Sequence, residues 1–144
     1  MSSLTELVIA ELADAEDVAR AASPTESWKS IRIEGLDQEK LSTLRSIVTN
    51  QAYEDEWIDD FRFLAGDPEE GPWVFAVPEA LIAGVANFPK NRLKAAVKQW
   101  SRTEAFKMDD WSLEDIEDRL KQLYALFQEA KQLRKTVLMY ISMT

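Results

Sequence analysis

A chain of 144 residues with 46% hydrophobic and 30% charged side chains has the size and composition of one soluble globular domain, residues 1–144. It contains no histidine and no cysteine, which excludes Ser–His–Asp and Cys–His catalysis, the common zinc sites and any disulfide. Its formal net charge of −9 disfavours direct binding to the phosphate backbone of nucleic acids.

The first part of the chain predicts two strands that alternate with two helices. Residues 5–12 are rich in Leu, Val and Ile and suit a strand, after which Asp14 is a typical N-cap for a short helix reaching about Ala22. Residues 28–34 alternate apolar and polar side chains, as a half-buried strand does. Asp37 then caps a second helix that carries an apolar stripe.

The middle of the chain predicts a helix, a sharp turn and a short strand. Trp57, Phe61 and Leu64 recur at positions i, i+4 and i+7, which favours a helix over residues 54–64. The stretch AGDPEEGP then combines Gly and Pro in the manner of a turn. Residues 73–77, WVFAV, are apolar and predict a strand that ends at a proline.

The last part of the chain is mainly helical and ends in a strand. The pattern predicts a short helix in PEALIAGVA and a longer one over residues 91–106. Ser112 and Asp115 have capping-box spacing and begin a helix to about residue 133, and residues 136–142 form the last strand. The whole predicts an α/β or α+β domain with a mixed sheet of about four strands, covered by helices mainly on one face.

The tryptophans divide between the predicted core and the predicted surface. Trp28, Trp73 and Trp100 lie in apolar patterns and are predicted core residues. Trp111 directly precedes a helix cap and resembles a hydrophobic staple. Trp57 lies on an apolar stripe but has acids on both sides, so its orientation stays open.

The acidity of the chain is concentrated in one segment. Residues 54–70 hold eight acids and one base, a local charge of −7, whereas the 18 acids and 16 bases elsewhere leave only −2. In a helix, like charges would lie one turn apart twice, in the pairs Asp55–Asp59 and Glu56–Asp60. Each such pair costs about 0.2–0.5 kcal/mol, so the stretch YEDEWIDDF repels itself when it is helical.

Three interpretations of these acids are open. They are a solvated helix face, or a surface that steers a basic partner to aromatic anchors, or oxygen ligands and acid pairs of a small carboxylate- or metal-dependent enzyme. No EF-hand spacing is present. We predict the partner surface, with no catalytic residue, metal or cofactor, and with these partner-binding residues: Tyr53, Glu54, Asp55, Glu56, Trp57, Asp59 and Asp60.

A basic ladder follows at helical spacing. Lys90, Lys94, Lys98 and Arg102 recur every four residues, and residues 90–107 carry a net charge of +5. This face is solvated, or pairs with the acidic segment of the same chain, or meets the acidic segment of a second copy in a homodimer. Anion binding is a further use that the lysines alone do not select.

Four stretches resemble a group of small uncharacterised bacterial single-domain proteins. They are ESWKSIRIEGLDQEKLSTLRSIVT (residues 26–49), GPWVFAVPEALI (residues 71–82), WSRTEAF (residues 100–106) and the closing VLMYIS. The resemblance covers more than half of the chain. It implies a bacterial or phage origin and a complete stand-alone domain, and it implies no established activity.

The sequence therefore predicts a non-enzymatic binding protein. It has no secretory signal at its start and no run near the ~20 apolar residues that span a bilayer, so we expect a cytoplasmic location. The acidic segment would meet a basic protein partner, such as a toxin or nuclease bound by an immunity protein or inhibitor, with the chain a monomer or homodimer. The alternatives are the small enzyme described above and a homo-oligomeric structural protein.

Overall fold

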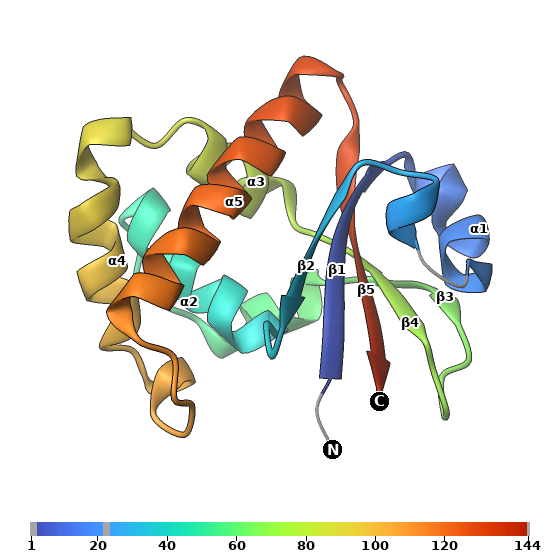
Figure 1. Ribbon diagram of the computed structural model, residues 1–144, viewed down its shortest axis with the longest axis horizontal. Helices are drawn as coiled ribbons and strands as arrows, with labels where there is room; N and C mark the ends of the chain where they lie inside the picture. Colours follow the sequence, from blue (N-terminus) through green and yellow to red (C-terminus); the bar gives the residue numbers. More distant parts are fainter. Residues whose placement is uncertain (1–2, 22–23, 144) are drawn as a thin grey trace.

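The chain folds around one antiparallel sheet of five strands, as the computed structural model in Figure 1 shows. The structure describes residues 3–21 and 24–143. The sheet order is β2-β1-β5-β4-β3, and every neighbouring pair is antiparallel. The strands are β1 (Ser3–Ala10), β2 (Ser30–Glu34), β3 (Phe63–Gly66), β4 (Trp73–Ala76) and β5 (Thr136–Met143).

Helices cover both faces of the sheet unequally. Four of them lie against one face and α1 lies against the other, beside β3 and β4 (Figure 1). The α-helices are α1 (Ala15–Arg20), α2 (Gln38–Thr49), α3 (Glu79–Ala86), α4 (Leu93–Ser101) and α5 (Leu113–Gln132). Short 3-10 helices are η1 (Leu12–Asp14), η2 (Pro24–Glu26), η3 (Asp55–Asp60), η4 (Lys90–Arg92) and η5 (Glu104–Phe106). The domain is α+β, and among the described residues no helix is both long and apolar enough to cross a membrane.

Side chains along β1 and β5 point alternately to the two faces of the sheet, and each face carries an apolar core. Leu7 and Met139 point to the four-helix side, where they meet Trp100 and Phe127 in the larger core. Val8 and its neighbours point to the α1 side and form the smaller one. Because successive strand residues face opposite ways, a central strand buried on both faces reads as a continuous apolar run, as VLMYIS does.

The predicted sheet of about four strands is close to the five observed, but the predicted mixed pairing is wrong, because the sheet is wholly antiparallel. The additional strand is β3, which the sequence pattern assigns to the end of a helix. Leu64 fits helical spacing after Phe61 and also suits a strand, so periodicity alone could not separate the two states. The turn predicted in AGDPEEGP is confirmed between β3 and β4, and Gly66 is required there because an added Cβ would collide with the Pro72 carbonyl oxygen.

The predicted α-helix over residues 54–64 is also wrong. The chain forms the 3-10 helix η3, and Phe61 then leaves helical conformation at φ −78° and ψ 84°. A 3-10 helix has about three residues per turn, so residues four apart no longer lie above one another. This geometry separates Asp55 from Asp59 and Glu56 from Asp60, but it aligns Glu56 with Asp59, three residues on.

The other helix predictions are largely confirmed. The capping box is present, since Ser112 Oγ accepts from the Asp115 N–H at 3.0 Å and the Asp115 carboxylate accepts from the Ser112 N–H at 3.3 Å. The helix predicted over residues 91–106 is shorter, because α4 ends at Ser101 and η5 follows after a turn. The predicted end of the first helix, Ala22, lies outside the described residues.

Three tryptophans differ in burial from one another. Trp100 is fully buried and donates from Nε1 to the Lys40 carbonyl at 2.8 Å. The predicted core residues Trp28 and Trp73 are only half-buried: Trp28 packs against the smaller core, and Trp73 donates to the Pro68 carbonyl. Their apolar sequence context does not reveal this partial exposure.

The turn that ends α5 places a non-glycine residue in the left-handed region. Arg134 has φ 57°, and the Lys135 N–H donates to the Ala130 carbonyl at 3.0 Å in the manner of a Schellman cap. We expect Arg134→Gly to raise the free energy of unfolding by about 0.5–1 kcal/mol, because glycine adopts this conformation without a Cβ penalty. Arg134→Ala, compared by urea unfolding, should give no gain, and equal stability of the two variants would contradict this explanation.

Candidate functional site

The acidic segment lies on the surface between α2 and β3. All five acids of YEDEWIDDF are exposed, and Tyr53 is 37% exposed. Trp57 is only 6% exposed and belongs to the interior. The structure therefore brings six of the seven predicted partner-binding residues to the surface and turns the seventh inward: Tyr53, Glu54, Asp55, Glu56, Asp59 and Asp60 are outside, and Trp57 is buried.

Trp57 attaches the acidic segment to α2 through Arg45. The Arg45 guanidinium lies 4.2 Å from the centre of the Trp57 ring, a cation–π contact. Arg45 Nη1 also donates to the Asp60 carboxylate at 2.8 Å, and the Tyr53 ring meets the Trp57 ring edge-on at 6.0 Å. A single arginine thus contacts the middle and the last residue of η3, so the neighbouring acids are held in fixed positions.

Most of the acids in this segment have no cation beside them. All eight carboxylates of residues 54–70 are exposed, and among the described residues only Asp60 makes an ion pair. Asp67 uses one oxygen to accept from the Glu69 and Glu70 N–H groups and so holds the turn. The remaining side chains present unneutralised negative charge to solvent.

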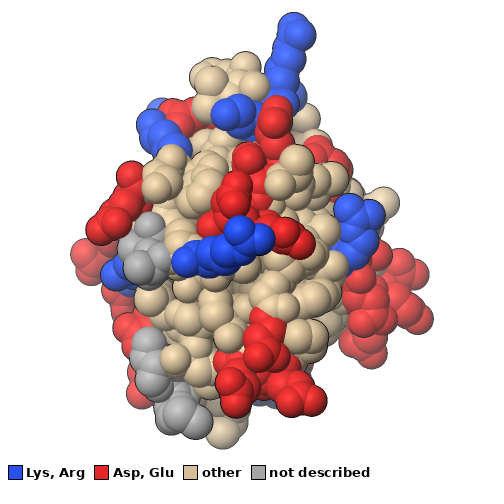
Figure 2. Space-filling view, turned by 90° about the vertical axis from the view of Figure 1, so that its right-hand side faces the viewer, with Lys and Arg blue, Asp and Glu red and all other residues tan. Residues whose placement is uncertain are grey.

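These acids form two clusters rather than one surface. Five precede β3 and three follow it, and β3 is an extended strand of four residues. A strand rises about 3.3 Å per residue, so the two clusters lie roughly 13 Å apart along it. Figure 2, which faces α1, shows acidic side chains gathered at separate places around this side of the molecule.

Apolar side chains lie beside the larger acidic cluster. Ile58 and Leu12 are both exposed. Leu12 lines a groove of about 450 Å³ together with Asp59, Asp60 and Glu79. Carboxylates around an apolar floor match the aliphatic stem and charged head of a lysine or arginine.

Tyr53 is held as a neutral phenol at this surface. Its partial burial first, and then the negative charges of Asp55 and Glu39, raise its pKa above the ordinary value of about 10. The hydroxyl therefore keeps its proton at neutral pH and can donate a hydrogen bond.

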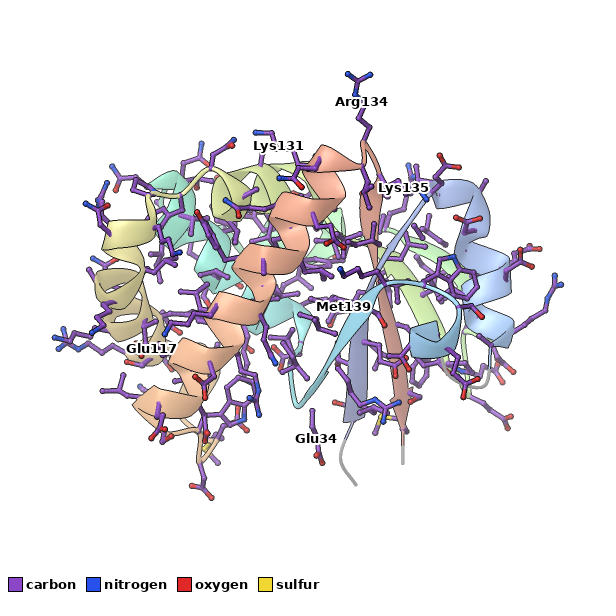
Figure 3. The ribbon with its side chains drawn as sticks, turned by 45° about the horizontal axis from the view of Figure 1, so that its top comes forward. Glu34, Glu117, Lys131, Arg134, Lys135 and Met139 are labelled. Carbon is purple, nitrogen blue, oxygen red and sulfur yellow. The ribbon has the colours of Figure 1, made fainter. Side chains whose placement is uncertain are left out.

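The structure does not pair the basic ladder with the acidic segment. Lys94 and Lys98 are exposed, and they line a groove of about 330 Å³ with Glu114 and Glu117 of α5 instead. Another basic group lies at the turn between α5 and β5, where Figure 3 shows Arg134 projecting away from the molecule. Of the uses left open for the ladder, pairing with the acidic segment of the same chain is not seen among the described residues, because the cation that reaches the acids is Arg45 of α2.

Lys40 is a buried charge that sequence reasoning missed. Its side chain is 3% exposed, and its Nζ lies 2.7 Å from Asp109 and 3.4 Å from Asp37. The ammonium also lies over the rings of Phe106 and Trp111, at 5.4 and 5.6 Å from their centres. This cluster connects the loop between α4 and α5 to the first turn of α2, so its role is to stabilise the fold.

Glu6 is a second buried charge, in the middle of the sheet. It is 1% exposed and accepts from Arg32 of the neighbouring strand at 2.8 and 2.9 Å. Tyr140 stands opposite Glu6 on β5. The one sequence feature that indicates this buried position is an acidic residue inside an otherwise apolar strand.

Tyr140 makes the stability of the fold sensitive to alkaline pH. Burial first, and then the charge of Glu6, raise its pKa above the ordinary value of about 10. The unfolded chain therefore releases this proton first, so stability that is present below pH ~10 is lost as the pH rises above it. We expect the free energy of unfolding to fall more steeply in the wild type than in Tyr140→Phe between about pH 10 and 12. Urea unfolding at a series of pH values measures the two slopes, and equal slopes would refute the assignment.

The described residues contain no group of three or more acidic side chains placed to hold a metal ion. Comparison with protein-family models, with curated proteins and with solved structures yields no match for this chain. Function is therefore argued from the geometry of the acidic surface.

Proposed function

We propose that this chain is a non-enzymatic binding protein whose acidic segment, from Tyr53 to Glu70, engages a basic protein partner. The observation that carries the proposal is that eight exposed carboxylates are clustered there while only Asp60 has an ion-pair partner among the described residues. Clustered charge of one sign speeds the association of an oppositely charged partner and selects against others.

The support beneath the acids favours binding over simple solvation. Arg45 and Trp57 fix η3 against α2, so the carboxylates keep their places before a partner arrives. A surface that is already ordered loses less conformational entropy on binding. Tyr53 and Ile58 add partly exposed apolar area among the acids, and tyrosine is enriched at binding hot spots.

An inhibitor of a basic nuclease, or an immunity protein against a basic toxin, is the concrete form of this proposal. The resemblance to small bacterial proteins, carried by residues 26–49 and 71–82, suggests a bacterial or phage host. We place the interaction in the cytoplasm of that host. The partner would carry lysines and arginines on the contacting surface.

Neutralising three acids tests the proposal and leaves the contacts of Arg45 with Trp57 and Asp60 in place. We expect the variant Asp55→Asn, Glu56→Gln, Asp59→Asn to capture at least tenfold less of a basic protein from a bacterial host lysate than the wild type does, since charge pairs at interfaces contribute strongly. Asp60 stays unchanged because it pairs with Arg45.

A matched variant controls for net charge alone. Asp17→Asn, Asp110→Asn and Asp118→Asn remove three exposed acids outside the segment and change the net charge by the same amount. This variant should capture the same protein as well as the wild type does. Equal capture by the two triple variants would contradict a role for the acidic segment.

A further inference from the structure

We propose that β3 binds an extended basic segment of the partner as a sixth strand of the sheet, an inference that rests on the proposed function and specifies how the partner binds. Among the described residues, β3 stands at one edge of the sheet and pairs only with β4. Its other side is an open edge, where backbone N–H and C=O groups are able to pair with a further strand.

The register of β3 directs the backbone of Phe63 to this open edge. Phe63 stands opposite Phe75, and the Ala76 N–H donates to the Arg62 carbonyl at 2.9 Å. In an antiparallel ladder a bond in that position flanks a pair that is not itself hydrogen-bonded across the two strands. The N–H and C=O of Phe63 therefore point away from β4, toward the edge that an added strand would occupy. The register with β4 shifts between Phe63 and Ala65, so this direction is assigned to Phe63 alone.

A groove runs along β3 beside this edge. It has a volume of about 550 Å³ and lies between β3 and α1, with Phe63 and Ala65 on one wall and Ala19 on the other. The Phe63 side chain is 42% exposed, and its ring meets the ring of Phe75, which packs against the larger core, at 5.9 Å. It therefore offers an apolar contact to a bound strand at the open edge, beside the groove. On the α1 wall, Glu16 and Arg20 pair at 3.1 Å, so that wall adds no net charge.

The two acidic clusters select a basic occupant. Asp59 and Asp60 precede one end of β3, and Asp67, Glu69 and Glu70 follow the other end. An added strand longer than β3 would meet carboxylates at both of its ends, and Arg62 is the only base among residues 54–70. Basic residues in an extended segment complement this pattern, whereas acidic ones are repelled.

A synthetic peptide of alternating lysine and valine tests strand addition directly. We expect the labelled peptide to bind the wild-type chain at low salt, as measured by fluorescence anisotropy. The same peptide with an N-methyl group on every backbone amide keeps its charge but has no backbone N–H to donate from either edge, so it should bind at least tenfold more weakly.

Two substitutions of Phe63 distinguish the contribution of its backbone to peptide binding from that of its side chain. Phe63→Pro removes the outward N–H, which makes no bond to β4, whereas Phe63→Ala removes the ring and keeps the N–H. We expect Phe63→Pro to bind the peptide about tenfold more weakly than Phe63→Ala, the effect of one lost backbone hydrogen bond. The N-methylated peptide gives the same information with the wild-type chain if Phe63→Pro fails to fold.

Two outcomes would overturn strand addition. They are equal binding of the methylated and plain peptides, and no binding of the plain peptide at low salt. In either case, selective loss of partner capture by the Asp55→Asn, Glu56→Gln, Asp59→Asn variant would still support the acidic surface. If that variant captures the partner normally while methylation abolishes peptide binding, the result supports strand addition at β3 and contradicts partner binding through the acidic segment.

Discussion

Trp57→Ala lowers the free energy of unfolding by about 3–4 kcal/mol, which is the usual cost of removing a large buried aromatic ring. The ring is 6% exposed and carries the cation–π contact to Arg45. Without it, Arg45 keeps its bond to Asp60 but loses the surface against which it packs, and Arg45 Nε is already buried without a hydrogen-bond partner among the described residues. The acidic segment should then detach from α2.

Ile58→Ala is the control for Trp57→Ala. Ile58 is the next residue of η3 but is exposed, so its truncation should change stability by no more than about 0.5 kcal/mol. Urea unfolding compares the two variants, and hydrogen exchange shows whether the amides of η3 open in Trp57→Ala alone. A loss below about 1 kcal/mol for Trp57→Ala would show that the segment is held by other contacts.

Lys40→Ala lowers the free energy of unfolding by about 3 kcal/mol, because it removes a buried side chain and a buried ion pair together. Lys40 is 3% exposed, and Asp109 lies 2.7 Å from its ammonium. Lys40→Met keeps the aliphatic stem and loses the charge, and it should cost less, about 1–2 kcal/mol, because Asp109 and Asp37 are half-exposed and can be hydrated.

Lys94→Ala is the control for the Lys40 variants. Lys94 is exposed and makes no ion pair in the described part of the chain, so its removal should stay within about 0.5 kcal/mol of the wild type. Thermal or urea unfolding measures all three variants. If Lys40→Ala lowers the free energy of unfolding no more than Lys94→Ala does, the cluster with Phe106 and Trp111 does not stabilise the loop between α4 and α5.

The sequence reveals those elements whose signals are local. The capping box at Ser112 and the apolar stripe of α5 lie within a few residues of each other, so their prediction is confirmed almost to the residue. The same holds for Asp37, which accepts from the Lys40 N–H and caps α2. The interleaved strands and helices left both α/β and α+β open, and the antiparallel pairing of the strands decides for α+β.

The features that sequence reasoning missed depend on contacts between distant segments. Lys40 is the cation of a buried cluster only because Asp109 folds back onto α2. Trp57 is anchored because Arg45 approaches its ring from another helix. β3 fits both a helix and a strand pattern, and pairing with β4 decides between them. Tertiary contacts override the local preference in each case.

The candidate site consists of the exposed carboxylates of residues 54–70 and of the contact between Arg45 and Trp57 that holds η3 in place. The inward-facing Trp57 leaves Tyr53 as the aromatic residue at the surface of YEDEWIDDF, so the acids, not a pair of aromatic anchors, dominate recognition. Long-range charge acts mainly on the rate of association and on its dependence on salt, whereas close contacts act mainly on dissociation. A kinetic measurement therefore tests the acidic surface more directly than affinity alone does.

The decisive measurement is the association rate constant of the captured basic partner at low and at physiological ionic strength. For the wild type we expect this rate to fall at least tenfold as salt is added, and for the variant Asp55→Asn, Glu56→Gln, Asp59→Asn we expect a slower rate with a much flatter salt dependence. The control Asp17→Asn, Asp110→Asn, Asp118→Asn should follow the wild type. The same salt dependence in all three proteins would contradict binding through the acidic segment.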